Sequence, residues 1–348
     1  MMPEEWPIAA HAADGSARAR LPRHGRLATV RIDFFLDPAQ RLSEQERALM
    51  TVMLHQLVRD LANALRAALP SGWLAANDED DAALIERLTK AGLLDEPDLI
   101  ALLLRRADEE RIWVASRARS GRREARALQT LVSNDNGPVA AAAMALILAR
   151  GRRRDRFGQC LLAFDDLAPH SATTLINAVA AALREELASN RGAPGADREL
   201  ATAMDQVKVQ RTPTRSIVIL ITDLVEQLAK AGSLTEDLVL TAANEGEVSF
   251  VAAYLAHLAE TETDVALEDL LSGDLQRFVS LLRQAEVSRN FASSLLAGIG
   301  DLLGVADAGE AIVLFDAMTT SDVDTLRSWL DADPAYRAAV DCLGLGRG

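Results

Sequence analysis

The sequence predicts an all-α protein made of HEAT-like helical hairpin repeats, an α-solenoid that is internally duplicated. Of its 348 residues, 49% are hydrophobic but only 4% aromatic, and Ala and Leu dominate, a composition that favours helices over sheets. The segment 84–92 (LIERLTKAG) returns at 224–232 as LVEQLAKAG, with six of nine positions identical. The segment 127–135 (ALQTLVSND) returns at 266–274 as ALEDLLSGD. Two matches in the same order indicate a duplication, which is typical of stacked helical repeats.

The first ordered element is expected to begin at Ser43, after an arm of residues 1–40 that Pro and Gly interrupt. Ser43 and Glu46 have the spacing of a capping box. Behind them, apolar residues recur at steps of three and four until Pro70: Met50, Leu54, Leu57, Leu61 and Leu65. This stripe predicts a long helix that packs on the protein's own core. The alternative is packing against a second copy in a homodimer.

The repeated nine-residue segment has the features of a helix end. In the first copy Leu84 and Leu88 would be buried, Lys90 lies in the last turn, where the helix dipole favours it, and Gly92 is expected as a left-handed cap. The next helix is predicted to start at Asp95. In the second copy Gly232 ends the helix and Thr235 is expected to cap the next. Both copies therefore predict an α-hairpin.

The remaining apolar patterns predict helices that fill two domains. In the first they cover 111–117, 123–132, 138–149, 158–164 and 171–187; in the second they cover 196–209, 217–230, 248–258, 265–271, 275–282, 291–303, 310–318 and 323–330. The helix over 138–149 is apolar nearly all round and is expected to be central. Ser189–Gly195 is the predicted linker, which divides the chain into helical repeat domains at 41–188 and 196–348. Exposed aspartates are expected to give the last helices a polar outer surface that closes the stack.

Composition limits the classes of function. The formal charge of −14 disfavours a general nucleic-acid binder. Two cysteines without metal-like spacing, Cys160 and Cys342, are expected to be free thiols in a reducing compartment. No stretch has the composition of a signal peptide or a membrane span, so we expect a cytoplasmic protein without membrane contact.

An arginine-rich stretch stands out against this acidic average. Residues 105–156 hold 13 arginines against six acidic residues. Candidate partner-binding residues are Arg150, Arg152, Arg153, Arg154 and Arg156, with Arg117, Arg119, Arg122, Arg123 and Arg126 upstream. Guanidinium groups bind carboxylate and phosphate as forks, so one hypothesis is an anion-binding surface for an acidic or phosphorylated partner or a nucleotide. The alternative, common for runs of charge, is a solvated segment that neutralises the acidic remainder of the chain.

Other chemical sites are weaker in this sequence. His55, in the long first helix, has the placement of a phosphotransfer histidine, but it borders the apolar stripe, where a core-edge histidine is expected. Asp165, Asp166 and His170 come nearest to a metal cluster, although a turn capped by Asp166 is the preferred interpretation. The helices after Gly92 and Gly232 are too apolar or too acidic for a DNA groove. We therefore predict no catalytic, cofactor-binding or metal-binding residues and no enzyme activity.

Four segments carry a resemblance to a known family. They are 33–36 (DFFL), 105–112 (RRADEERI), 143–146 (AMAL) and 152–158 (RRRDRFG), considered together with the helix after Ser43. In them the chain resembles alphaproteobacterial proteins grouped as domain of unknown function 2336, from about Asp33 to the C-terminus. The resemblance implies a HEAT-like helical repeat protein and supplies no catalytic residues.

The sequence thus predicts a non-enzymatic scaffold or regulatory adaptor that binds another protein and needs no cofactor. The alternative function is a nucleotide- or phosphoryl-responsive signalling protein that uses His55. The identity of the partner does not follow from the sequence.

Overall fold

The computed structural model describes residues 44–70, 73, 81–120, 127–212, 216–333, 336–337, 339–340 and 343. In these residues the chain forms fifteen α-helices, two short 3₁₀-helices and one π-helix, with a single isolated β-bridge between Arg154 and Cys160. The fold is therefore all-α, as predicted. The predicted arm (1–40) and the capping residue Ser43 lie outside the described residues.

Fifteen α-helices make up most of the described chain. They are α2 (Glu44–Ala68), α3 (Asp81–Lys90), α4 (Pro97–Ser120), α5 (Ala127–Thr130), α6 (Gly137–Arg152), α7 (Pro169–Arg191), α8 (Ala193–Gln210), α9 (Ile217–Lys230), α10 (Glu236–Asn244), α11 (Val248–Ala259), α12 (Thr263–Leu271), α13 (Leu275–Gln284), α14 (Arg289–Leu295), α15 (Ala308–Ala317) and α16 (Thr320–Leu330). Short 3₁₀-helices cover Leu131–Ser133 and Phe164–Asp166, and the π-helix covers Leu296–Gly300.

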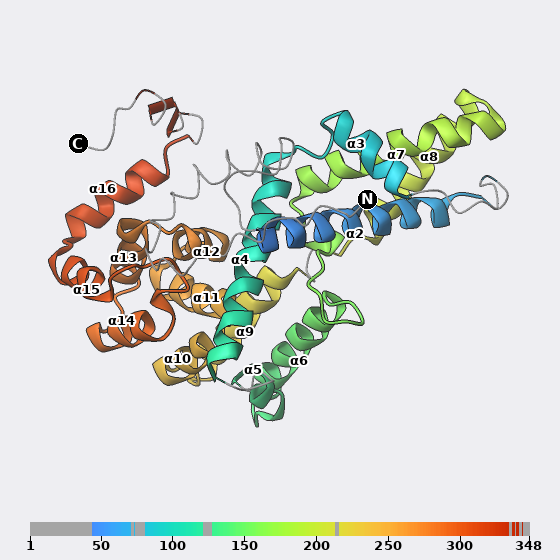
Figure 1. Ribbon diagram of the computed structural model, residues 1–348. Coiled ribbons are helices and arrows are strands. Elements are labelled where there is room, and N and C mark those ends of the chain that lie inside the picture. The colour runs from blue at the N-terminus through green and yellow to red at the C-terminus, as the bar shows by residue number, and fades with distance from the viewer. Residues whose placement is uncertain are drawn as a thin grey trace, which may run out of the picture.

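Two hydrophobic clusters form the core. The N-terminal cluster joins α2, α3, α7, α8 and the first half of α4, while the C-terminal cluster joins α5, α6, α9 to α16 and the second half of α4. Figure 1 shows α4 running through the centre of the molecule between these groups. Because α7 and α8 return to the N-terminal cluster after α6 has joined the other, the clusters interleave along the chain.

This packing bears on the predicted linker. Helix α7 continues to Arg191 and α8 starts at Ala193, with Gly192 between them at φ 81°. The two helices pack against each other in one cluster, so Ser189–Gly195 contains the turn of an α-hairpin. The boundary between the clusters does not coincide with this turn, and the division into folding domains at 189–195 stays a prediction.

The repeated helix ends behave alike. Gly92 and Gly232 have φ values of +67° and +65°, the left-handed conformation that glycine adopts without a Cβ clash. The amide after each glycine donates to the carbonyl five residues earlier, Leu93 to Leu88 over 3.0 Å and Ser233 to Leu228 over 2.9 Å. The predicted apolar residues of both copies are buried: Leu84, Ile85, Leu88, Leu224, Val225 and Leu228.

The long first helix also follows its predicted pattern. Met50, Leu54, Leu57, Leu61 and Leu65 are all buried in the N-terminal cluster, where α2 packs on α4, α7 and α8. Its apolar stripe is therefore used inside the chain, which confirms the predicted core packing.

Several predicted boundaries were wrong. The expected helix over 111–117 is part of the continuous α4, and residues 158–163 of the expected helix over 158–164 lie outside any helix. The expected cap at Asp95 is displaced, because the Glu96 carboxylate accepts from the amide of Leu99 over 2.7 Å. The stretch 291–303 divides into α14 and the π-helix.

Helix α6 is not central, although its sequence is apolar nearly all round. One side packs on α9, with Val139, Ala142, Ala143, Leu146 and Ala149 buried. The opposite side faces outward and leaves Met144 42% and Leu148 55% exposed. Hydrophobicity alone could not show this difference, because nothing in the composition of α6 distinguishes its two sides.

The C-terminal helices end the fold with a polar exterior. As predicted, Asp322, Asp324, Asp331 and Asp333 are exposed. Asp269 is fully buried and holds α13 and α16 together through Arg277, at 2.7 Å, and Arg327. Within the described residues, no helix has both the length and the apolar character needed to cross a lipid bilayer.

Candidate functional site

The arginine-rich candidate site lies at the end of α6 and in the hairpin that follows it. Asn136 starts α6 by accepting from the amide of Val139 over 3.2 Å, and Pro138 suits the first turn. After Arg152 the chain doubles back over 153–161, where the amide of Leu161 donates to the carbonyl of Arg153 over 2.8 Å. We call residues 153–161 the hairpin. Asp155 stabilises its tip by accepting from the amides of Phe157 and Gln159, each over 2.8 Å.

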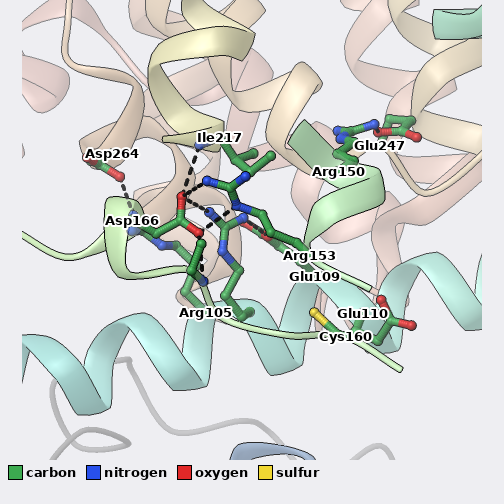
Figure 2. A network of polar contacts seen from close by, with 12 residues as sticks. Arg105, Glu109, Glu110, Arg150, Arg153, Cys160, Asp166, Ile217, Glu247 and Asp264 are labelled. Carbon is green, nitrogen blue, oxygen red and sulfur yellow. Dashed lines mark hydrogen bonds and ion pairs between the residues drawn. The ribbon is translucent and has the colours of Figure 1, made fainter. Parts of the chain in front are cut away.

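Asp166 is the centre of a buried polar network behind this hairpin. Its carboxylate accepts from Nε and Nη2 of Arg153 over 2.7 and 2.8 Å, and from the amide of Ile217 over 3.1 Å. Arg106 approaches it to 3.9 Å. Figure 2 shows Arg153, from the hairpin, and Ile217, at the start of α9, converging on the carboxylate. The network thus connects both hydrophobic clusters.

The surroundings of Asp166 fix its charge. Burial alone would raise the pKa of this carboxyl group, whose side chain is only 1% exposed, but Arg153, Arg106 and the Ile217 amide lower it below its ordinary value. Burial of the Arg106 guanidinium opposes its positive charge. The carboxylates of Glu109, at 2.5 Å, and of Asp166 favour that charge and outweigh the burial, so the pKa of Arg106 is raised. Both groups are therefore ionised at neutral pH.

Two further arginines of the run also point inward. Arg150 pairs with the buried Glu247 over 2.5 Å. Arg154 forms two hydrogen bonds with Glu110, of 3.0 and 2.7 Å, and lies 4.2 Å from the ring centroid of Trp113. These pairs attach the end of α6 and the hairpin to α4 and to the start of α11.

The remaining two arginines face solvent. Arg152, at the end of α6, is exposed, and so is Arg156 at the tip of the hairpin. Arg156 lies 4.7 Å from the ring centroid of Phe157, which is itself 74% exposed. We call Met144, Leu148, Arg152, Arg156 and Phe157 the outer surface, since all five are exposed and lie on α6 or the hairpin.

The five predicted site residues are therefore not one patch. Arg150, Arg153 and Arg154 pair with buried or partly buried carboxylates, whereas Arg152 and Arg156 are exposed. Of the upstream arginines, Arg119 pairs with Asp301 over 2.9 Å. Arg122, Arg123 and Arg126 lie outside the described residues.

Sequence reasoning missed the carboxylates that hold the inner arginines, above all Asp166, which was expected only to cap a turn. A signal for the arginines themselves was present. A step of four from the buried Leu146 and Ala149 reaches Arg150 and Arg153, whereas a step of four from the exposed Leu148 reaches Arg152. No pattern in the sequence connects Arg153 with Asp166, because that contact depends on how the hairpin folds back.

The pKa values of two other candidate residues, His55 and Cys160, are shifted by their surroundings. His55 is half-buried on α2, and burial and then Arg59 lower the pKa of its imidazole, which favours the neutral form. Burial raises the pKa of the Cys160 thiol to about 11, so this thiol stays protonated at neutral pH. Across the described residues no group of three or more His, Cys, Asp or Glu side chains could hold a metal ion. Cys342 lies outside them.

Comparison with known proteins identifies the family. The family model described as "Uncharacterised protein conserved in bacteria (DUF2336)" matches residues 87–327. This match covers most of the chain, which therefore belongs to DUF2336. The matched region starts well after Asp33, where the resemblance was expected to begin. Neither the curated proteins nor the solved structures contain a match to this chain.

Proposed function

We propose that this member of DUF2336 is a non-enzymatic adaptor that binds an acidic protein through the outer surface of α6 and the hairpin. The observation that carries the proposal is the exposed side of α6. Here Met144 and Leu148, 42% and 55% exposed, occupy successive turns and are followed one turn later by Arg152. Apolar side chains in water beside unpaired positive charge are typical of protein-binding surfaces.

The chemistry of this surface suggests the kind of partner. From Gly137 to Arg152 the sequence of α6 contains no acidic residue, although the whole chain carries a charge of −14. A helix with an apolar stripe and an acidic flank would cover Met144 and Leu148 and bring carboxylates to Arg152 and Arg156. Such charges chiefly increase the rate of association and the specificity.

We further propose that the scaffold is a HEAT-like stack of duplicated helical hairpins. The two repeated helix ends support this, since both have a left-handed glycine, the same amide-to-carbonyl bond and the same buried positions. Helices α7 and α8, which pack against each other across Gly192, form a further α-hairpin with a different turn. Stacked hairpins expose whole helix sides, as the proposed surface of α6 requires.

A photo-crosslinking residue placed at Leu148 tests the proposal in living cells. The matched control is the same residue at Val313, which is 69% exposed on α15, far along the chain from the outer surface. We expect a discrete crosslinked product from Leu148 that is absent from Val313 and weakened in the Arg152→Glu/Arg156→Glu variant. A product formed with a second copy of this chain would show that the outer surface is a homodimer interface and not an adaptor site. Equal products from both positions would refute the outer surface as a specific binding site.

A further inference from the structure

A cavity of about 270 Å³ lies on the inner side of the candidate site. Its walls come from the middle of α4, from α5, from the end of α6, from the hairpin and from the starts of α9 and α11. The charged residues in these walls are Arg106, Glu109, Glu110, Arg117, Arg150, Arg153, Arg154 and Glu247. Five arginines and three glutamates leave an excess of positive charge in a chain that is otherwise acidic.

Two buried polar atoms, on residues that line this cavity, have no hydrogen-bond partner in the described part of the chain. They are Nε of Arg106 and Oε1 of Glu109, both buried. The Arg106 side chain is only 7% exposed, although its other end pairs with Glu109. A buried donor and a buried acceptor left unpaired cost stability, and a bound molecule that satisfies both would recover it.

The lining of the cavity includes an aromatic ring beside two guanidinium groups. Arg117 and Arg154 each lie 4.2 Å from the ring centroid of Trp113. The ring restricts their conformations and orders them before any ligand arrives. Val248 and Ser249, the first residues of the twelve-residue α11, also line the cavity, so the positive end of that helix dipole adds to the field.

We propose that this cavity binds a small hydroxylated phosphate ester, of the class of sugar phosphates and nucleotides. The phosphate group lies against Arg117, Arg154 and the start of α11. A hydroxyl group of the ligand donates to Oε1 of Glu109, and a ligand oxygen accepts from Nε of Arg106. Leu128, Ile147 and Leu161 enclose the carbon skeleton. A site of this volume is at the small end of ligand cavities, which suits a single sugar ring. The proposal does not depend on the outer surface.

Tryptophan fluorescence of the full chain tests this site directly. The four tryptophans are Trp6, Trp73, Trp113 and Trp329, so a Trp6→Phe/Trp73→Phe/Trp329→Phe variant reports on Trp113 alone. We expect ribose 5-phosphate to change this fluorescence saturably, inorganic phosphate to bind more weakly, and ribose to have no effect. Loss of one charge-assisted contact in Arg117→Gln should raise the Kd about tenfold or more, while Arg152→Gln, which alters an arginine outside the cavity, leaves it unchanged.

Three results would overturn the proposal. The first is no saturable response to ribose 5-phosphate at millimolar concentration in wild-type-folded protein. The second is equal affinity for inorganic phosphate and ribose 5-phosphate, which would leave only a general anion site. The third is the same Kd in Arg117→Gln and Arg152→Gln with unchanged circular dichroism, because binding would then occur elsewhere.

Discussion

The arginines between 150 and 156 form an inner and an outer group, although they are neighbours in the sequence. Arg150, Arg153 and Arg154 pair with buried or partly buried carboxylates just before α11, in the 3₁₀-helix and on α4, whereas Arg152 and Arg156 face water. The helical period of α6 and the return of the hairpin decide which arginine belongs to which group. A run of like charges is thus not one functional unit, and each member has to be judged by the side it faces.

Arg153→Ala is expected to have the largest effect on stability. It removes both guanidinium hydrogen bonds from Asp166 and leaves a carboxylate that is 1% exposed without its main partner. Breaking a buried pair in this way costs about 3–5 kcal/mol of unfolding free energy. Urea unfolding followed by circular dichroism measures the loss. The adjacent Arg152→Ala is the control and should change the free energy by less than about 0.5 kcal/mol.

Gly246→Ala is expected to have the next largest effect on stability. Gly246 lines the same cavity as Arg150, Arg153 and Arg154. Gly246 has φ +84°, and a Cβ there would lie 2.7 Å from the backbone Cα of Trp113. Gly232→Ala is the matched control, since it has φ +65° but open space around the added carbon. The control should lose about 1–2 kcal/mol from backbone strain alone. Gly246→Ala should lose clearly more, and equal losses would show that α4 and α11 are not closely packed there.

The loss of stability in acid that arises from Asp166 should be smaller than these two effects and specific to this residue. The pKa of Asp166 is lowered in the folded protein, so its contribution to stability is complete above the ordinary aspartate pKa and is lost as pH falls below it. Asp166→Asn should therefore be less stable at neutral pH and should lose part of the decline seen between about pH 5 and 2. Asp197→Asn, which alters an exposed ion pair with Arg184, should leave that decline nearly unchanged. Melting curves across this pH range compare the three proteins.

The sequence was sufficient for features that depend on local periodicity. The stripe from Met50 to Leu65 and the left-handed glycines at 92 and 232 were all predicted, because each follows from residues within one or two turns. The contact of Arg153 with Asp166 was not predictable, since the two residues are thirteen positions apart and meet only through the return of the hairpin. The outward side of α6 was missed for a related reason, because an alanine-rich helix has no polar face to show its orientation.

The continuous α4 was also missed, and the reason is electrostatic. Its middle, RRADEER at 105–111, reads as a solvated break between two apolar stretches. In the folded chain these charges pair with residues from both clusters. Arg105 pairs with Asp264, and Arg111 pairs with Glu46 over 3.6 Å. Because these charged residues find partners distant in sequence, the middle of α4 can be enclosed by the rest of the protein.

The division between inner and outer arginines is tested most directly by the Arg152→Glu/Arg156→Glu variant, which carries a photo-crosslinking residue at Leu148. We predict that its urea midpoint stays close to that of the wild type while the crosslinked product at Leu148 is lost. Retention of the product in a fully folded variant would contradict the outer surface as a binding site. A large fall in the urea midpoint would instead show that the outer arginines, like the inner ones, hold the fold together.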